Sequence, residues 1–479
     1  MNQYILPIFV ILYLFITIGI WIYASRKVKN ENDFLVAGRK LPIYIVIATV
    51  FATWFWSETV LWTSSVFLEE WLLWIMADPF WAALCLIIVS IFFARPMYRL
   101  WITTLWDFYK LKYGRTVEML ASICILVSYI WWVAAQIVAL WIVFNVISFW
   151  IISTFMWAWI GASIVLIYTI AWWMWSIAFN DFVQMIMIVL GLLIATFFVT
   201  SGLENGMMDV VNHAIANSKF ELFPEWVSFY AILWIIFALG TLWFWSIPQQ
   251  DVFQRVLSAR DEKTAVRWSI IGWSLYLIFA FIPIMLGYAA YLVNPELFER
   301  LGDTQLILPT LILESTPIFV QIVFFWALIS AIMSTASATL LAPSALFTQN
   351  ILKPFIKVEE KQLLKLTRFV VFWIFLLIMS FVTYKFNNED ANIFSMVEEA
   401  YKITLAWALF PLIAWIIIKK THSISWLLSL ISWIAIWLAM ENINPDGFVP
   451  PQFWWFFASM IWFFIGQLLA KIYGFKDEK

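Results

Sequence analysis

The chain has 479 residues, of which 64% are hydrophobic and 12% are charged, and its formal net charge at pH 7 is −2. Soluble domains are about 45–50% apolar and about 25% charged, so this composition excludes a soluble globular protein. Mostly apolar segments of about 20 residues recur along the whole chain, each long enough to cross the hydrocarbon core of a lipid bilayer. We therefore predict an all-α polytopic membrane protein with no soluble catalytic domain and no nucleic-acid partner.

Thirteen apolar segments are candidate membrane spans, and they start near residues 4, 42, 72, 117, 150, 175, 229, 266, 317, 364, 391, 423 and 452. Basic residues gather in alternate loops, within 26–40, 95–115, 255–267, 353–368 and 419–420, whereas the other loops hold only Lys219, Arg300 and Lys385. By the positive-inside rule the basic loops are cytoplasmic. We expect a multi-pass protein of the plasma (inner) membrane, with its N-terminus outside and its C-terminus in the cytoplasm. The first span lacks a basic leader and a small-residue cleavage site, which favours a retained helix over a signal peptide.

Tryptophan occurs 34 times and glycine only 14 times, although membrane helices normally use more glycine than soluble ones. Several tryptophans fall inside spans or at tight turns, away from the interfaces where Trp gathers: Trp56, Trp62, Trp157, Trp172 and Trp173. Some bacterial lineages read a stop-type codon as glycine, which a default translation writes as tryptophan. Our hypothesis is that many of these positions are glycine in the native protein. The alternative is a truly tryptophan-rich protein.

Five separated stretches carry a resemblance to a known family. They are the segment from ATWFWSETVLW to Leu100, TLWDFYKLKYGRTVEML, IYTIAWWMWSIAFNDFVQ, IPQQDVFQR and SAIMSTASATLL. Over roughly residues 5–470 the chain resembles the sodium:solute symporter family, which includes proline, sugar and vitamin transporters. Where that family shows paired glycines, this chain has Trp172 and Trp173, and small residues would also be expected at Trp56, Trp62, Trp71, Trp74 and Trp81.

The resemblance implies a fold of the leucine-transporter type, in a single transmembrane domain over 1–479. Its core would be two five-helix repeats of inverted topology, at about 42–200 and 229–417, followed by two peripheral helices at 423–473. In this family the first helix of each repeat is broken at mid-membrane. The tetrapeptide WFWS falls in both of these helices, at 54–57 and 243–246, and Pro248, which lacks an N–H donor, follows the second copy. We expect both helices to be interrupted there, and the monomer to be the transport unit.

The same resemblance implies a sodium site formed by the carbonyls of Ala52 and Phe55 together with Ala331, Ser334 and Thr335. A broken helix leaves carbonyls without partners, which a membrane tolerates only where they line a cavity or bind a cation. Carbonyl and hydroxyl oxygens suit a hard cation such as Na⁺. The alternative is that both hydroxyls bond to carbonyls of their own helix.

Asp181 lies inside a predicted span, where an ionised carboxylate is expensive and therefore usually functional. Members of the family often hold an acid near the inward path of the cation, so we assign Asp181 to the sodium ion, in release or coupling. The alternative is an acid that caps a helix near the cytoplasmic surface.

Five further residues are candidate contacts of the transported solute: Glu58, Asp78, Gln136, Gln249 and Gln250. Glu58 follows the first break, and Asp78 matches a position that touches sugar in the sugar-transporting branch. Both acids suit a solute with an amino group or several hydroxyls. Either acid could instead pair with a buried donor.

These features predict a sodium-coupled secondary active symporter that imports a small organic solute by alternating access, with Na⁺ as the coupling ion. Proline, another amino acid, a carboxylate or a sugar would each suit. A proton-driven carrier and a membrane sensor with a partner signalling protein are the alternatives. We expect no enzymatic activity, because an enzyme would need clustered His, Asp or Cys. The two histidines are scattered, and Cys85 and Cys124 lie in apolar spans.

Overall fold

A computed structural model describes residues 2–25, 36–148, 154–171, 174–222, 228–230, 232, 247–356, 360–388, 393–418, 421–443 and 451–474. Within these ranges the regular structure is helical, apart from one isolated bridge between Leu41 and Ala259. The predicted all-α class is therefore confirmed.

The long helices are α1 (Asn2–Ser25), α8 (Arg115–Ile147), α9 (Thr154–Ala171), α10 (Met174–Thr200), α14 (Ser269–Tyr288), α18 (Ile318–Leu346), α19 (Glu360–Asn388), α20 (Ile393–Ile417), α21 (Ser423–Ile443) and α22 (Pro451–Tyr473). The shorter ones are α3 (Ile43–Trp54), α4 (Thr63–Glu69), α5 (Ala82–Ile88), α6 (Ala94–Arg99), α7 (Leu105–Tyr113), α11 (Met207–Ala216), α13 (Gln250–Leu257), α15 (Ala290–Val293), α16 (Glu296–Arg300) and α17 (Ile307–Ser315). Brief 3₁₀ or π-helical segments adjoin them: η1 (Ala37–Arg39), η2 (Glu58–Trp62), η3 (Met76–Trp81), η4 (Val89–Phe93), η5 (Thr264–Trp268), η6 (Thr304–Leu306) and η7 (Phe347–Leu352).

Eight helical stretches in the described residues are long and apolar enough to cross a membrane. Three of them combine several elements: Asp78–Arg99, Thr264–Val293 and Ile318–Leu352. Helix α3 and the bent stretch Glu58–Glu69 add a ninth span if the two together cross the membrane once. The multi-pass prediction is thus confirmed, but the predicted count of thirteen is not. The span predicted to start near residue 229 falls largely on 231 and 233–246, outside the described residues.

The first of the two predicted helix breaks is present. Helix α3 ends at Trp54, the chain leaves helical geometry at Phe55, and a helix resumes at Glu58 with its axis bent by 59°. Phe55 has φ −88° and ψ 80°, and its N–H still bonds to the carbonyl of Phe51 at 3.0 Å. The break therefore falls on the first WFWS copy. The second copy, 243–246, lies outside the described residues.

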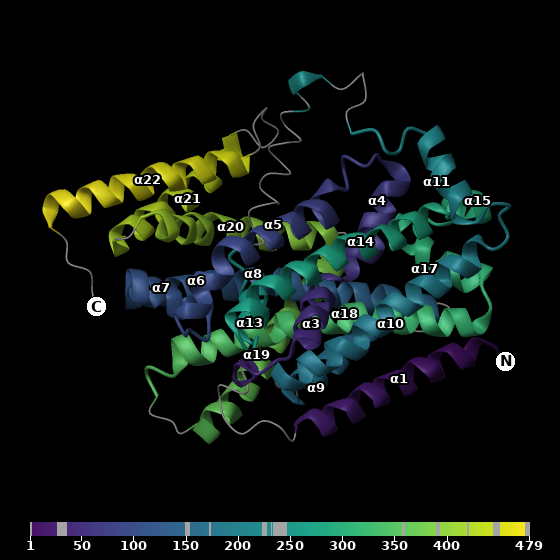
Figure 1. The fold of residues 1–479 in the computed structure, drawn as a ribbon, viewed down its shortest axis with the longest axis horizontal. Coiled ribbons are helices and arrows are strands. Elements are labelled where there is room, and N and C mark those ends of the chain that lie inside the picture. The colour runs from purple at the N-terminus through teal and green to yellow at the C-terminus, as the bar shows by residue number, and fades with distance from the viewer. Residues whose placement is uncertain are drawn as a thin grey trace.

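Helices α3, α10, α14 and α18 pack together in the middle of the bundle (Figure 1). Helix α1 lies along one edge, and α21 and α22 lie side by side at the opposite edge. Close approach of these helices depends on small residues, as is usual in membranes. A Cβ added to Gly272 of α14 would meet Val50 Cγ1 of α3 at 2.5 Å. A Cβ on Gly191 of α10 would meet Ala327 Cβ of α18 at 2.5 Å and the Val323 carbonyl oxygen at 2.9 Å.

Replacing Gly191 by leucine is expected to lower the thermal unfolding temperature of the purified protein, because the side chain would force α10 away from α18. Overpacking of this kind costs about 1–3 kcal/mol. Gly202 is the matched control, since an added Cβ there has nothing within 4 Å. Equal unfolding temperatures for the Gly191→Leu and Gly202→Leu variants would contradict the close approach of the two helices.

Candidate functional site

Asp181 joins three helices in the middle of the bundle. Its carboxylate, on α10, is 1% exposed and accepts a hydrogen bond from Ser334 Oγ of α18 at 2.7 Å. The hydroxyl of Thr49, on α3, donates to the other carboxylate oxygen. Asp181 therefore lies inside α10 with its oxygens turned toward α3 and α18. This geometry does not fit the alternative of an acid that caps a helix end.

Ser334 and Thr335 behave differently from the other hydroxyl residues of α18. Ser337, Thr339 and Ser344 donate to carbonyls of their own helix, at 3.0, 2.8 and 2.8 Å. Ser334 instead donates to Asp181, and Thr335 Oγ1 donates to the carbonyl of Thr53 on α3 at 3.2 Å. The two hydroxyls thus reach across the helix interface, contrary to the alternative of bonding within their own helix.

The residues predicted to hold sodium are all buried where α3 and α18 approach each other. Ala52 and Phe55 are 0% exposed at the end of α3, and Ala331 is 1% exposed on the same face of α18 as Ser334 and Thr335. The hydroxyl, carboxylate and carbonyl oxygens that meet here form the kind of oxygen-rich set that a hard cation prefers. The assignment of these residues to sodium stays a prediction.

The second half of the broken helix carries a further polar cluster, around Asp78. Its carboxylate is 4% exposed and accepts hydrogen bonds from Thr59 Oγ1 at 2.8 Å, from Thr63 Oγ1 at 3.4 Å and from the hydroxyl of Tyr276 on α14. Asp78 thus pairs with buried donors, which is the alternative that the sequence left open. Its predicted contact with the solute stays a prediction.

Of the other predicted solute residues, Glu58 and Gln136 lie at the break, and Gln249 and Gln250 lie at the start of α13. Glu58 is 2% exposed and begins η2. Gln136 of α8 is 0% exposed, and its Oε1 accepts from Ser57 Oγ, in the break itself, at 3.0 Å. Gln249 is buried just before α13, whereas Gln250 Oε1 accepts from the Leu105 N–H at 2.8 Å and ties α13 to α7.

Aromatic rings surround the break. The Trp54 and Trp56 ring centroids lie 5.1 Å apart, and the Trp132 ring of α8 lies 6.1 Å from Trp54 and 5.1 Å from Trp56. Tyr129, one turn earlier on α8, lies 5.3 Å from Trp132. All four side chains are buried. The break therefore combines acids, amides and electron-rich ring faces within one small region.

Residues 34–432 match the family model of the sodium:solute symporter family. The chain belongs to the sodium:solute symporter family. The family is named for the joint transport of sodium and a solute.

Its relatives transport chemically different solutes. The chain is 27% identical over 354 residues to a high-affinity choline transporter of Drosophila melanogaster. The aligned region covers 71% of this chain and 55% of that protein. It is 24% identical over 371 residues to a sodium/glucose cotransporter of Vibrio parahaemolyticus, covering 72% and 68% of the two chains. The chain therefore spans little more than half the length of the choline transporter.

A solved structure confirms the leucine-transporter type of fold. The protein is similar to the substrate-bound, outward-open state of a Na⁺-coupled sialic acid symporter, with a TM-score of 0.80 at 19% identity, over 100% of this chain and 99% of that one. The boundaries of the two five-helix repeats stay a prediction.

Several residues of the site were not predicted from the sequence. Thr49 and Thr53 lie four residues apart on α3, and their isolation in an otherwise apolar helix could have identified them. Tyr129 donates to Asp251 Oδ1 of α13 at 2.8 Å, and Arg255, 1% exposed, donates to the Asp251 carbonyl at 3.3 Å. Nothing in the local sequence marks the contact between Tyr129 and Asp251, because α8 and α13 lie far apart in the chain. Asp251 and Arg255, in contrast, lie four residues apart on α13.

The glycine hypothesis predicts the mass of the native protein. Trp56 is 1% exposed and Trp62 is 8% exposed, so the side chain at each position fills space between helices. We expect the intact mass of protein purified from its natural host to fall below the mass of the written sequence by a whole multiple of the Trp–Gly residue difference. A measured mass equal to that of the written sequence would contradict the hypothesis.

Proposed function

We propose that this protein is a sodium-coupled symporter that imports a small organic cation, such as choline, across the plasma (inner) membrane as a monomer. The observation that carries sodium coupling is the cluster of Asp181, Ser334 and Thr335 against the broken end of α3. Na⁺ would take the hydroxyl oxygens, the Asp181 carboxylate and the carbonyls at the end of α3. The family name and the Na⁺-coupled structural relative support the same ion.

The surroundings of the break support an organic cation as the solute. Glu58 supplies a buried acid, and the Trp54 and Trp132 rings, whose centroids lie 6.1 Å apart, supply aromatic faces. Aromatic faces attract ammonium groups, by about 0.5–2 kcal/mol each, and aromatic cages are a general solution for quaternary ammonium ligands. The choline transporter among the relatives fits this chemistry.

Coupling would follow from the shared break. Thr53 accepts the Thr335 hydroxyl at 3.2 Å, and only four residues later Ser57 donates to Gln136 at 3.0 Å. An ion that fixes the end of α3 also fixes the backbone that presents Ser57 and Glu58 to the solute. Sodium and solute would then bind one conformation better together than separately, which is the requirement for symport.

Uptake of radiolabelled choline into proteoliposomes tests the function. We expect accumulation with an inward sodium gradient, and none when potassium replaces sodium at the same pH. Adding betaine-like solutes or amino acids as competitors of choline uptake then distinguishes a site for organic cations from a site for amines in general. Uptake that follows a proton gradient without sodium would contradict sodium coupling, and sodium-driven uptake of a neutral solute alone would contradict the cation site.

The aromatic rings predict a specific loss of affinity. Trp132→Leu is expected to raise the KM for choline by about two- to thirtyfold, because one cation–π contact of about 0.5–2 kcal/mol is lost. Trp426, fully buried in the peripheral helix α21, is the matched control, and its replacement by leucine should leave KM unchanged. An unchanged KM for folded Trp132→Leu would remove this ring from the solute site.

A further inference from the structure

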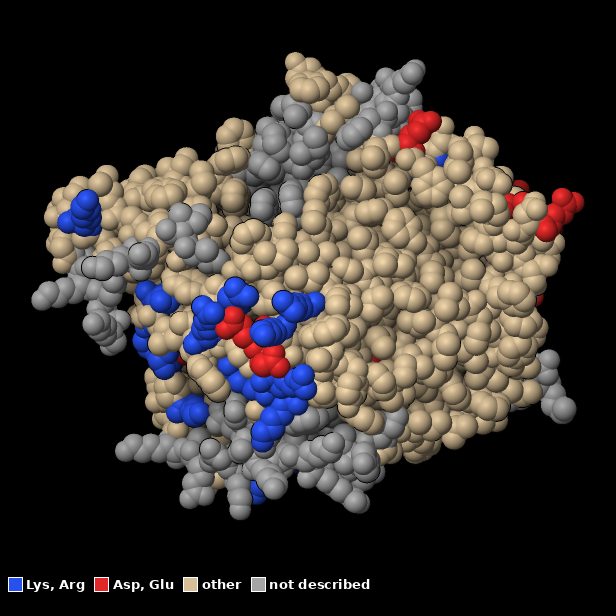
Figure 2. Space-filling model, viewed as in Figure 1, with Lys and Arg blue, Asp and Glu red and all other residues tan. Residues whose placement is uncertain are grey.

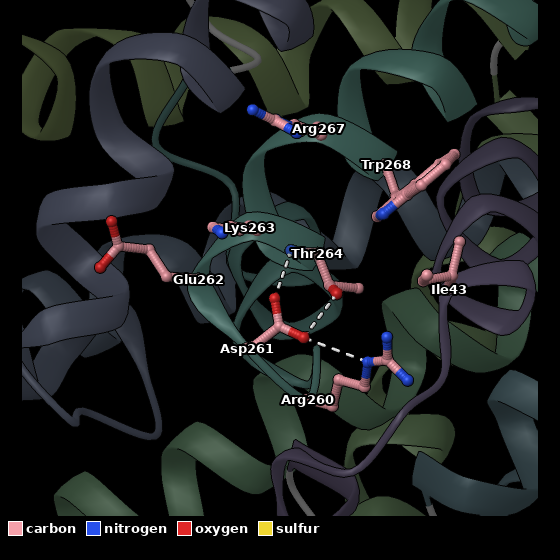
Figure 3. Close-up of a pocket in the computed structure, with 8 residues that line it drawn as sticks. All are labelled: Ile43, Arg260, Asp261, Glu262, Lys263, Thr264, Arg267 and Trp268. Carbon is pink, nitrogen blue, oxygen red and sulfur yellow. Dashed lines mark hydrogen bonds and ion pairs between the residues drawn. The ribbon is translucent and has the colours of Figure 1, made fainter.

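A pocket of about 590 Å³ lies at the basic end of the molecule, away from the break in α3. It is lined by Ile43, Arg260, Asp261, Glu262, Lys263, Thr264, Arg267 and Trp268. Figure 3 shows Ile43, Trp268 and Arg260 around one side of this pocket, with Glu262 on the opposite side. The positive-inside rule assigns this end to the cytoplasm.

The acids at the pocket are already paired. Glu262 Oε1 lies 2.8 Å from Arg95 Nε, and Glu262 Oε2 lies 2.9 Å from Arg99 Nε. Asp261 accepts from the Thr264 N–H at 2.8 Å and from Arg260 Nε at 3.1 Å. The hydrogen bond from Arg99 lowers the pKa of Glu262, and the backbone N–H of Thr264 lowers the pKa of Asp261. Both carboxylates therefore stay ionised and neutralised near pH 7.

The cations outnumber the acids. Arg95, Arg99, Arg260, Lys263 and Arg267 surround the two carboxylates, and Figure 2 shows this blue patch with its red centre. Lys263 and Arg267 are exposed and four residues apart, and within the described part of the chain neither side chain has an ion pair. Their charge is available for an anionic ligand.

The pocket also adjoins the hydrocarbon region. The membrane span Thr264–Val293 begins inside it, and Ile43 is the first residue of α3. On the same face of the span as Arg267, at spacings of four and eleven residues, Ile271 is 38% exposed and Ile278 is 63% exposed. Cations at the end of a span, above an exposed aliphatic stripe, suit a ligand with an anionic head and acyl chains.

We propose that this pocket binds the phosphate headgroup of an anionic phospholipid from the cytoplasmic leaflet. Lys263 and Arg267 pair with the phosphate, the Trp268 indole lies at the level of the headgroup, and the acyl chains run along Ile271 and Ile278. Free phosphate esters share the anionic head, but they lack the chains that the aliphatic stripe would contact.

The pocket is also connected to the helix that carries the sodium cluster. The Leu41 N–H bonds to the Ser258 carbonyl at 3.1 Å, and the Arg260 N–H bonds to the Leu41 carbonyl at 3.2 Å. These bonds fasten the segment before α3 to the rim of the pocket. A bound headgroup would hold this junction together and so stabilise the folded protein.

Thermal unfolding of the purified full-length protein in detergent tests the site. Phosphatidylglycerol, phosphatidylcholine and glycerol 3-phosphate are titrated separately at fixed salt. We expect phosphatidylglycerol alone to raise the unfolding temperature in a saturable way. Equal protection by glycerol 3-phosphate would identify a free phosphate-ester site and overturn the lipid assignment, and equal protection by phosphatidylcholine would overturn the charge-based site.

Substitutions of the pocket cations test whether phosphatidylglycerol binds at this pocket. Lys263→Gln with Arg267→Gln is expected to weaken the apparent affinity for phosphatidylglycerol by roughly tenfold or more, because each cation near an anionic surface contributes about 1 kcal/mol. The matched control is Lys365→Gln with Lys471→Gln, two exposed lysines on α19 and α22. All four residues are exposed, so both proteins should fold. Equal weakening in the two proteins, or none in the first, would overturn the proposal.

Discussion

Replacing both Ser334 and Thr335 by alanine is expected to abolish sodium-dependent uptake. The double variant removes one hydroxyl from Asp181 and another from the Thr53 carbonyl, bonds that measure 2.7 and 3.2 Å. Each buried partner left without its hydrogen bond costs about 1–3 kcal/mol, and the ion loses two oxygen ligands in the same change. We expect the sodium concentration for half-maximal uptake to rise by at least about a hundredfold, beyond the range that a cellular gradient supplies.

The controls separate the loss of ligands from a loss of folding. Ser344 lies on the same helix and is equally buried, but its hydroxyl donates to the Leu340 carbonyl of α18 at 2.8 Å. Ser344→Ala should therefore keep the sodium dependence of the unaltered protein. Size-exclusion profiles and unfolding temperatures report on folding for each variant. Normal sodium dependence in a folded Ser334→Ala/Thr335→Ala protein would exclude these hydroxyls from the ion site.

The Asp181→Asn variant distinguishes the charge of Asp181 from its hydrogen bonds. The amide keeps one oxygen to accept from Ser334 or Thr49, but it removes the negative charge that the cluster offers to a cation. If Asp181 serves coupling, sodium dependence should weaken while the protein remains folded. Measuring uptake against sodium concentration for the Asn variant beside the hydroxyl variants distinguishes the charge from the hydrogen bonds.

The sequence was sufficient for the parts of the site that have a local signature. Asp181 is such a residue, because it stands out as an acid within an apolar span. The interruption at WFWS and the choice of Ser334 and Thr335 among the hydroxyl residues of α18 come from the resemblance to the family. A window of a few residues carries periodicity and composition, but it does not by itself distinguish these hydroxyls from the others on the helix.

The partners of those residues could not be predicted in the same way. Asp181 meets Thr49 and Ser334 across 132 and 153 residues of chain, and Asp78 meets Tyr276 across 198 residues. Such pairs depend on how whole helices pack, and packing follows from close approaches like that of Gly191 to Ala327 rather than from any local pattern. For the same reason the sequence around Asp78 gives no sign of its buried donors Thr59 and Tyr276.

Asp78 is expected to tolerate asparagine but not leucine. An asparagine can still accept from one hydroxyl and donate to another, because the hydroxyls of Thr59, Thr63 and Tyr276 can each rotate to donate or accept. Leucine removes the acceptor that the three hydroxyls share, and leaves Thr63 Oγ1 with the Glu58 carbonyl at 3.2 Å and Thr59 Oγ1 with the Tyr276 hydroxyl at 3.3 Å. At about 1–3 kcal/mol for each group left without a good partner, this loss is a large fraction of the stability of a typical folded protein.

The expected results are a sharp fall in the yield of folded Asp78→Leu protein, and uptake by Asp78→Asn within about threefold of the unaltered protein. Tyr276→Phe provides an intermediate control, since it removes one donor of the three and leaves Thr59 at 2.8 Å from the carboxylate. Folded Asp78→Asn protein that no longer binds the solute would show that the charge itself acts on the solute. In that case Asp78 would join Glu58 in the cation site, and the hydrogen bonds from Thr59 and Tyr276 would serve to orient its carboxylate.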